Sequence, residues 1–552
     1  MNIFIENYHI TQSVNVGTPS RPIKSILISI FILGISISHV YGQEKTCSQG
    51  RQKVIFKPQT IFDENEQGFS VVHHWANAIH IDTKKITLEN EAAFFIEKCD
   101  KNFADMAELE RHLRSRKYLR DAKITSDKML ENITVTTWDN WSLMPTISFG
   151  RQGGESTYSF GIKERNLLGL GIGVEIQTYK SSQRKGYKLK STIPLFRKKN
   201  IDIKLRFADN DDGTQQSLFL QKHFASFYTN DAYNIGFNEE SHNDTIYQNN
   251  SELAIFTHNV SFKNAEYAWL DSNTNSASLR YRIGITQDQH TFFPVDNTEN
   301  SINSSFLPQD RDFIYPWLGV DYIEKNFKKL TNIHLITQIE DFNHGWKLSS
   351  RLGISDGTKK NNAWALFQVN IGKGFEIHDK ALLLMNIALH NDIYKQHDNR
   401  LLLSINAEYF YNIDPSWGFY LSNTSIVSKN QYLDKPITIG GSSGLRGFPL
   451  QYQHGEHSIK FTSEIRYYPH INLFKLFDLA GLAFLDSGKS FGDSVADNSE
   501  EALLHSVGIG ARLYSPHSTR SHQVIHIDFA FPQSNNTGIN SFEIRVEAKH
   551  SF

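Results

Sequence analysis

Apolar and polar residues alternate with a period of two through most of the chain after Pro145. The runs 277–285, 346–354 and 403–411 show this most clearly, and arginine or another polar residue stands between the apolar positions. Each run has about the nine to eleven residues that a tilted β-strand needs to cross a bilayer. Apolar rows on such strands contact lipid, while polar rows line a wet lumen. The pattern therefore predicts a mostly β protein built on a transmembrane antiparallel β-barrel.

The length of this region predicts the number of strands. About 400 residues follow Pro145, and at roughly 25 residues for a strand and its share of loop they predict about sixteen strands. The polar stretches 209–216, 238–251 and 288–311 are expected to be long loops at one end of the barrel. No regular blade repeat is found, whereas a soluble β-propeller would need one.

Residues from about 50 to 140 have a different pattern, because apolar residues recur there at helical spacing. One predicted helix carries Leu88, Ala92, Phe95, Ile96 and Cys99 on one face, with Thr87 as its N-cap. A second carries Met106, Leu109 and Leu113, and strands are expected within 53–62, 122–125 and 133–138. One strand, two helices and two strands form a small α+β domain. The segment 65–85 does not fit this minimal pattern and is expected to lengthen the first strand or add a docking surface.

The longest apolar run lies near the start of the chain, at residues 25–40, and Arg21 and Lys24 precede it. A basic flank followed by an apolar run and a small-residue site is typical of a secretory signal peptide, with a membrane anchor as the alternative. The expected organisation is a signal peptide at 1–42, a small periplasmic domain at 43–140 and a barrel at 141–552.

Only two cysteines are present, Cys47 and Cys99. In an oxidising compartment they can form a disulfide bond. Cys99 can equally serve as a small apolar residue on a helix face, so both interpretations stay open.

Composition narrows the class of protein. A net charge of −2 and the lack of a long basic run indicate that nucleic acid is not a partner. Mean hydropathy is −0.42, too polar for a bundle of membrane helices but compatible with a barrel. Aromatic residues make up 12%, including 38 Phe and 22 Tyr, as expected for belts of rings at two membrane interfaces.

Catalytic and metal-binding motifs are weak in this sequence. Gly440 to Gly444 matches G-x-S-x-G, which would make Ser442 the nucleophile of an acyl hydrolase. That motif needs a helix directly after the serine, and Pro449 follows instead, so the match is interpreted as chance. His454 with His457, and the adjacent pair His73 and His74, lack the spacing of a zinc helix and are expected at the surface. We expect no enzyme activity, no cofactor and no metal site.

The segment Gly440–Phe448 places one arginine among glycines and directly before a Gly-Phe pair. It resembles the arginine-glycine-aromatic loop of the BamA/TamA superfamily of outer-membrane assembly and translocation barrels. Later segments resemble the strands that follow this loop in the family: 462–469, 483–488, 506–516 and 527–532. The small domain resembles one POTRA domain, and the last strand ends in Phe552, the form of the C-terminal signal of outer-membrane barrels.

This resemblance implies roles for particular residues. Arg446 is expected to pair with Glu464 and Asp486 on the inner wall of the barrel, because a buried guanidinium needs carboxylate partners. The remaining loop residues have supporting roles: Gly444 and Gly447 allow a tight backbone beside Leu445, and Phe448 wedges against the lumen wall.

The resemblance also implies a function and a location. The expected location is the outer membrane of a Gram-negative bacterium, with the POTRA domain in the periplasm. The expected work is insertion, assembly or export of polypeptides, with unfolded clients meeting the domain and the seam between the first and last strands. Outer-membrane lipid and periplasmic or lipoprotein partners would complete the system. A single POTRA domain predicts an accessory or dedicated member. The alternatives are a two-partner secretion pore, a passive channel or structural barrel and, more remotely, an outer-membrane acyl hydrolase using Ser442.

Overall fold

The computed structural model describes residues 52–62, 71–127, 132–152, 155–196, 200–295, 306–356, 363–396, 398–441, 445–474, 476–493, 498–516, 524–534, 536 and 538–549. The predicted signal peptide, Cys47, Ser442, Gly444 and Phe552 lie outside these residues.

The small domain is a three-stranded sheet with helices packed on it. The strands are β1 (Lys53–Gln59), β2 (Leu119–Ser126) and β3 (Asn132–Asp139), in the order β1-β3-β2, with β1 parallel and β2 antiparallel to β3. The helices are α2 (Val71–Ile79), α3 (Lys85–Glu91), α4 (Ala93–Ile96) and α5 (Phe103–Arg114). Asn102 and Asp105 form a reciprocal capping box at the start of α5. The buried core joins the apolar faces of α3, α4 and α5 to the sheet.

The first predicted helix differs from the observed structure in three ways. It is divided at Ala92 into α3 and α4, and it ends at Ile96, before Cys99. Thr87 is inside α3 rather than at its N-cap, and its hydroxyl donates a 2.8 Å hydrogen bond to the carbonyl of Gly169 in the barrel. Helical spacing identified the buried face correctly, but a contact with another domain decided the role of the threonine. The segment 65–85, which did not fit the minimal pattern, contains helix α2. It does not lengthen the first strand, because β1 ends at Gln59.

The described residues from Leu143 onward form a closed antiparallel barrel of 20 long strands. In chain order they are β4 (Leu143–Gln152), β5 (Glu155–Leu167), β6 (Ile172–Lys180), β7 (Lys185–Leu195), β8 (Ile201–Asn210), β9 (Gly213–Lys222), β10 (Asp231–Gln248), β11 (Ser251–Asn273), β12 (Ala277–Pro294), β13 (Arg311–Glu324), β16 (Lys347–Ile354), β17 (Ala365–His378), β18 (Ala381–Ile393), β19 (Arg400–Asn412), β20 (Trp417–Lys429), β23 (His457–Tyr467), β25 (Phe477–Phe491), β26 (Leu504–Tyr514), β27 (Val524–Gln533) and β28 (Glu543–Lys549). Short strands β14 (Phe327–Leu330) and β15 (Glu340–Asn343), β21 (Ile437–Ile439) and β22 (Gln453–Gly455), and β24 (Asn472–Leu473) belong to its connections.

The prediction of about sixteen strands was wrong, because several expected loops are strands. The stretch 209–216 is a tight hairpin between β8 and β9, and 238–251 is the end of β10 and a turn formed by Asn249 and Asn250. Both asparagines have positive φ, which asparagine tolerates better than most residues. Polar residues on strands were mistaken for loop residues, so the average length of a strand and its connection was overestimated.

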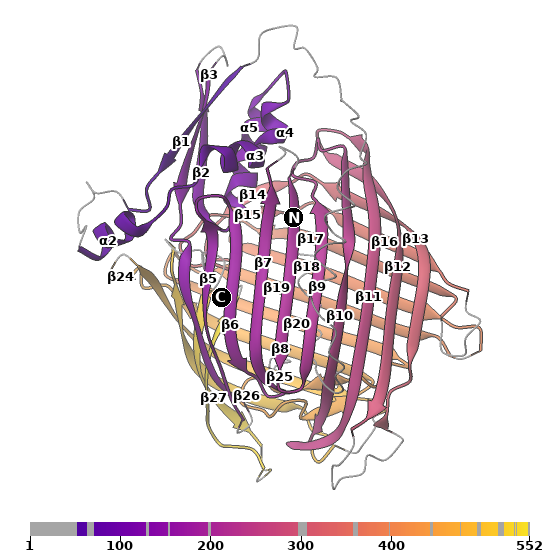
Figure 1. The fold of residues 1–552 in the computed structure, drawn as a ribbon. Helices are drawn as coiled ribbons and strands as arrows, with labels where there is room; N and C mark the ends of the chain where they lie inside the picture. The colour runs from indigo at the N-terminus through magenta and orange to yellow at the C-terminus, as the bar shows by residue number, and fades with distance from the viewer. Residues whose placement is uncertain are drawn as a thin grey trace.

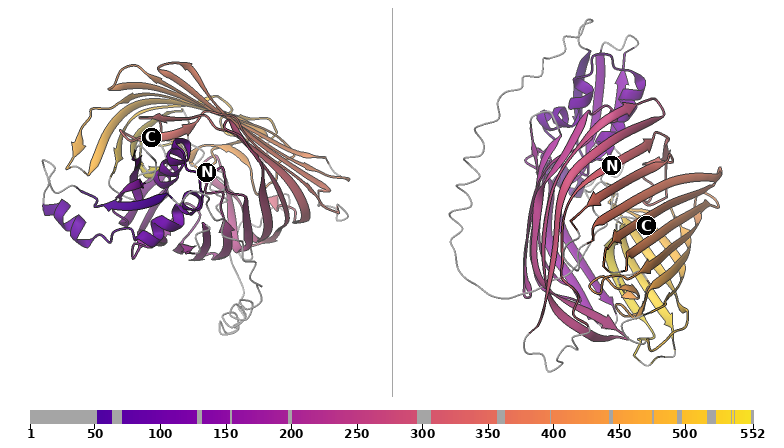
Figure 2. Two further views of the ribbon diagram at one scale, coloured as in Figure 1. Left: turned by 90° about the horizontal axis from the view of Figure 1, so that it is seen from above. Right: turned by 90° about the vertical axis from the view of Figure 1, so that its right-hand side faces the viewer.

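The small domain lies at one end of the barrel, which we call the domain end; the opposite end is the far end (Figures 1 and 2). Ion pairs and hydrogen bonds hold the domain there. Arg114 of α5 forms a bidentate pair with Asp341, at 2.8 and 3.0 Å, and Glu110 pairs with Lys329 at 2.8 Å. Both barrel partners belong to the β14–β15 hairpin, which extends from the domain-end connection between β13 and β16.

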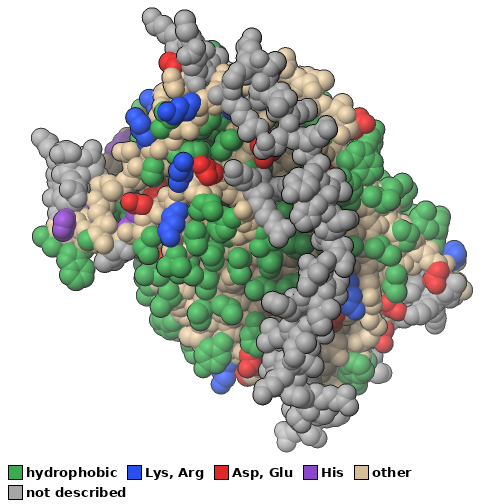
Figure 3. Space-filling model, turned by 45° about the horizontal axis from the view of Figure 1, so that its top comes forward, with side chains coloured by type: hydrophobic (Ala, Val, Ile, Leu, Met, Phe, Trp, Pro, Cys, Tyr) green, Lys and Arg blue, Asp and Glu red, His purple; other side chains and the backbone are tan. Residues whose placement is uncertain are grey.

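The outer face of the barrel carries an apolar belt. Large hydrophobic side chains are exposed on strands all around the barrel, among them Ile147, Phe160, Ile283, Leu352 and Ile465. Figure 3 shows hydrophobic side chains gathered on one side of the barrel. Such a surface far exceeds the few hundred Å² of apolar patch that a water-soluble monomer exposes, and lipid is the environment that suits it. Among the described residues, no helix is long and apolar enough to cross a membrane.

Candidate functional site

The predicted arginine lies inside the barrel on a long connection from the far end. We call residues 430–456, between β20 and β23, the lumen loop. Its strands β21 and β22 pair antiparallel, and this small ladder carries the residues between them into the lumen. The amide of Gly441 donates to the carbonyl of Phe448 at 3.0 Å, which closes the tip of the loop. Arg446 is only 7% exposed at this tip.

Arg446 contacts both carboxylates that the resemblance implied. Its Nε and Nη2 atoms donate to the two oxygens of Asp486 on β25, at 2.6 and 2.8 Å, in a bidentate pair. Its Nη1 donates to Glu464 on β23 at 3.2 Å. Two adjacent strands thus hold the guanidinium from one side. Bidentate geometry fixes orientation as well as adding energy.

Additional charged residues complete this group, which we call the Arg446 network. Glu464 also pairs with Arg466 at 2.9 Å, and Arg512 of β26 pairs with Asp528 of β27 at 2.7 Å. Asp528 lies 3.9 Å from Arg446. The network contains three guanidinium groups, Arg446, Arg466 and Arg512, and three carboxylates, Glu464, Asp486 and Asp528. Burial of these charges is tolerated because opposite charges balance them.

Aromatic contacts add to the ionic ones. The guanidinium carbon of Arg446 lies 3.5 Å from the centroid of the Phe484 ring, and that of Arg466 lies 3.9 Å from the centroid of Tyr420. A cation over a ring gains about 0.5–2 kcal/mol, more when water is excluded. Arg446 therefore lies between a carboxylate wall and an aromatic face. Apart from the alternation of the strands, no feature of the sequence points to these aromatic partners.

The residues beside Arg446 anchor the tip by packing. Leu445 and Phe448 are fully buried and form a cluster with Ile439, Tyr452 and Leu504. Phe448 packs mainly against residues of its own loop, and its ring centroid lies 5.6 Å from that of Tyr452. Leu504 belongs to the barrel wall, so the expected wedge is formed jointly with the loop.

Gly447 has a φ of +86°, and a Cβ there would lie 2.9 Å from the Cδ of Pro532. Only glycine satisfies both constraints without strain.

The other residues singled out from the sequence are located as follows. Cys99 is disulfide-bonded, while Cys47 lies outside the described residues, as do Ser442, Gly444 and Phe552. The expectation that all four motif histidines lie at the surface was wrong for two of them. His73 is buried on α2, where its Nε2 contacts the carbonyl of Phe474 at 3.1 Å, and His454 is buried on β22. Both became buried through contacts between distant segments.

A second segment enters the lumen from the domain end, and sequence reasoning missed it. Residues 331–339, which we call the domain-end segment, connect β14 to β15. Leu335 and Ile336 are buried against a cluster on β25–β27 that includes Phe484, the ring beneath Arg446. Arg466 of the Arg446 network donates to the carbonyl of Ile333 at 3.3 Å. Segments from opposite ends of the barrel thus meet on the same wall.

The barrel closes through a short pairing between its first and last strands. Among the residues that the structure describes, β28 and β4 share only two residue pairs, Arg545 with Gly150 and Val546 with Phe149. By contrast, β27 and β28 pair over seven positions and β4 and β5 over ten. We call the β28–β4 contact the seam.

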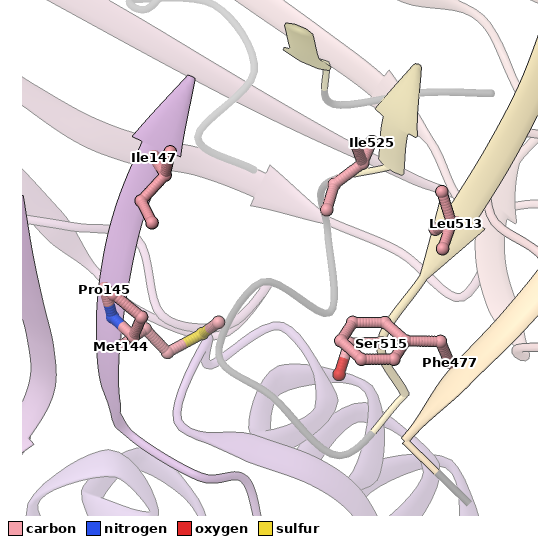
Figure 4. Close-up of a pocket in the computed structure, with 7 residues that line it drawn as sticks. All are labelled: Met144, Pro145, Ile147, Phe477, Leu513, Ser515 and Ile525. Carbon is pink, nitrogen blue, oxygen red and sulfur yellow. The ribbon is translucent and has the colours of Figure 1, made fainter. Parts of the chain in front are cut away.

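An apolar cavity of about 180 Å³ lies beside the seam, between β4 and the strands β25 to β27 (Figure 4). It is lined by Met144, Pro145 and Ile147 of β4 on one side and by Phe477, Leu513, Ser515 and Ile525 on the other. All of these residues lie toward the domain end of their strands. The cavity is therefore at the domain end of the seam.

Comparison with known proteins gave matches only among solved structures. No protein-family model matches the chain, and no curated protein does. Similar solved structures include CdiB from Escherichia coli, with 12% identity, a TM-score of 0.45, and coverage of 90% of this chain and 76% of that chain. CdiB from Acinetobacter baumannii has 11% identity, a TM-score of 0.43 and coverage of 90% and 73%.

A further similar structure is BamA from Haemophilus ducreyi lacking POTRA domains 1-3. It shows 12% identity and a TM-score of 0.39, with coverage of 90% of this chain and 84% of that chain. Because identity to all three is low, what this chain does is argued below from its own geometry.

Proposed function

We propose that this protein is an outer-membrane barrel that inserts, assembles or exports polypeptides, with its domain end in the periplasm. Neither a cofactor nor a bond-making step is part of the proposal. Three features of the chain support it: the apolar outer face, the lumen loop fixed by Arg446, and the short seam. A passive pore would need the first feature but has no use for the third.

The seam is the observation that carries the proposal. In a bilayer, an unpaired backbone N–H or C=O costs several kcal/mol, so a barrel normally pairs its strands throughout. Within the described residues, β28 and β4 share only two residue pairs, so this contact is the easiest one to open. An opened edge presents a row of backbone groups that an incoming strand can pair with. The seam thus provides a site for a client strand.

The small domain supplies a second set of strand edges. Because the sheet order is β1-β3-β2, both β1 and β2 are edge strands. An extended client segment can add to such an edge by backbone hydrogen bonds with little dependence on its sequence. Arg114 and Glu110 fix this sheet against the β14–β15 hairpin, so a bound segment would be held at the entrance of the barrel.

A disulfide across the seam tests the proposal directly. Phe149 and Val546 are paired residues, and Phe149 faces outward with half of its side chain exposed. The double substitution Phe149→Cys with Val546→Cys should lock the seam and abolish client insertion or secretion, and reduction should restore it. The matched control is Phe160→Cys with Thr178→Cys, an outward-facing pair on β5 and β6. Normal activity in the oxidised seam variant would exclude a mechanism that opens the seam.

The nature of the clients is decided by quantitative proteomics of outer membranes before and after depletion of the protein. Loss of many unrelated barrels would indicate general assembly. Loss of one or a few surface or secreted proteins would indicate a dedicated exporter, including the two-partner secretion alternative. An unchanged proteome together with ion conductance would indicate the passive channel.

A further inference from the structure

A group of histidines and aspartates lies inside the barrel toward the far end, away from the Arg446 network. His242 and Asp244 are on β10, His258 is on β11 and His290 is on β12. The register places His242 directly opposite His258, so their side chains share the inner face. All four residues are at most 3% exposed. The fold thus brings together imidazole and carboxylate groups from three consecutive strands.

The surroundings place this group near the far-end mouth. Ser241, Asn243 and Asn259 point outward beside it, whereas the outward residues nearer the domain end of the same strands include Ile235 and Trp269. Strands β10 to β12 therefore extend past the apolar belt, and the histidine group lies inside this extension.

The distances suit metal ligation. Ligand atoms of His242, Asp244 and His258 all lie within 4.8 Å of one another. His258 Nδ1 is 2.9 Å from an oxygen of Asp244, and His242 Nε2 is 3.7 Å from the other oxygen. A tetrahedral zinc ion with bonds of about 2.0–2.1 Å holds neighbouring ligand atoms roughly 3.3 Å apart. Small side-chain rotations therefore convert this triad into a coordination site.

His242 is the member that hydrogen bonding does not account for. Its side chain is buried, yet neither ring nitrogen makes a hydrogen bond of acceptable geometry to any described residue. The nearest acceptor, Glu240, lies 3.1 Å from Nδ1. A buried polar group without hydrogen bonds costs free energy, and a metal ion is one partner that removes this cost.

A chain of polar contacts runs from the triad toward β12. Asp244, His258, His290 and Asp288 are joined in this order by contacts of 2.9, 2.8 and 3.1 Å. Further imidazole and carboxylate groups therefore stand directly behind the triad, as the groups that orient metal ligands usually do.

The group is also connected to the lumen loop. His258 belongs to a second set of potential ligands with His290 and Asp434, and Asp434 is a residue of the lumen loop. Arg311 of β13 holds Asp434 through a bidentate pair, with both distances 2.8 Å. Binding at His258 would therefore act on the same loop that presents Arg446.

We propose that His242, Asp244 and His258 form a binding site for a divalent first-row transition metal ion, with zinc as the representative. Two imidazoles and one carboxylate are a ligand set that zinc uses with an open fourth position. His290 and Asp434 are additional donors close to His258. By joining β10, β11 and the loop, the ion would stabilise the far-end mouth.

The test uses the purified full-length protein in detergent, stripped of metal with a chelator and carrying no polyhistidine tag. Zinc binding is measured by calorimetry and by elemental analysis, and the cobalt-loaded protein is examined by visible absorption for imidazole ligation. We expect one tight zinc ion for each chain. His242→Gln and Asp244→Asn should each weaken binding at least about tenfold, since even residues behind a metal ligand affect affinity to that extent.

A matched control variant distinguishes zinc binding at the barrel triad from zinc binding in the small domain. His80, Asp82 and Asp139 form a further potential triad in the small domain, so His80→Gln makes the same chemical change elsewhere. It should leave zinc affinity unchanged. Heat-modifiable migration in gels shows that each variant retains a folded barrel. Zinc binding that survives both barrel substitutions, zinc binding that is lost in His80→Gln, or no stoichiometric binding to the folded wild type would each overturn the proposal.

Discussion

Replacement of Arg446 by alanine is the sharpest test of the lumen network. The substitution removes the bidentate pair with Asp486, the hydrogen bond to Glu464 and the contact with the Phe484 ring. It leaves two buried carboxylates with one cationic partner fewer. The backbone of the loop and the packing of Phe448 stay in place, so the change acts on the ionic contacts of the tip.

The expected magnitude follows from the burial of the pair. Removing one partner of a buried ion pair costs about 3–5 kcal/mol, because the remaining charge stays desolvated. Each 1.4 kcal/mol is about a tenfold change in an equilibrium constant. The equilibrium between docked and undocked loop should therefore shift by roughly two to three and a half powers of ten. The shift is expressed as more frequent opening of the loop.

Hydrogen exchange of peptides covering residues 445–456 measures this opening in the folded protein. Protection of these amides should fall by that factor in Arg446→Ala, while amides of β17 and β18 keep theirs. Arg446→Lys should give an intermediate loss, because lysine keeps the charge without the bidentate fork. The double variant with Asp486→Ala should lose less than the sum of the single variants. Unchanged protection and wild-type client handling in Arg446→Ala would refute the anchoring role.

Three further predictions concern other parts of the chain. Gly447→Ala should destabilise the docked loop by about 1–3 kcal/mol, because alanine is strained at positive φ. Loop hydrogen exchange should show this for Gly447→Ala but not for Gly481→Ala, whose Cβ would lie at an ordinary contact distance of 3.9 Å from the carbonyl oxygen of Gly510. In the small domain, burial raises the pKa of Glu91, but Arg116 and the hydrogen-bonded His112 outweigh it and lower the pKa to about 2. This carboxylate therefore stabilises the folded domain above pH 4.5, by about 3 kcal/mol, and the contribution is lost as the pH falls from 4.5 toward 2. Hydrogen exchange of α3 and α5 across that range should show the loss in wild type, and a Glu91→Gln variant whose profile has the same slope would contradict it. Replacement of residues 331–339 by a Gly-Ser linker should raise single-channel conductance in planar bilayers, because Leu335 and Ile336 then no longer cover the inner wall. The control is a variant in which the exposed turn 413–416 is replaced by the same kind of linker. Equal conductance of the two variants would contradict this prediction.

Much of the barrel was predictable because a strand between lipid and a wet lumen must alternate apolar and polar residues. Alternation along 277–285 and 403–411 identified strands with one apolar face, and these are parts of β12 and β19. The rule does not specify where a strand ends when it extends past the membrane. Strands β10, β11 and β12 have polar outer faces at the far end, so their polar stretches were mistaken for loops and the strand number was underestimated.

The sequence by itself determined the local features of the candidate site: an arginine on a glycine-rich loop, and two carboxylates on later strands. Their nature is set by short-range chemistry, since a buried guanidinium requires carboxylate partners. The tertiary structure alone decided the two-pair seam, the domain-end segment beneath Phe484 and the meeting of His242 with His258. These depend on strand register and barrel closure, in which a shift by one residue turns every side chain to the opposite face. Register is a property of the whole sheet, and no single segment of the sequence contains it.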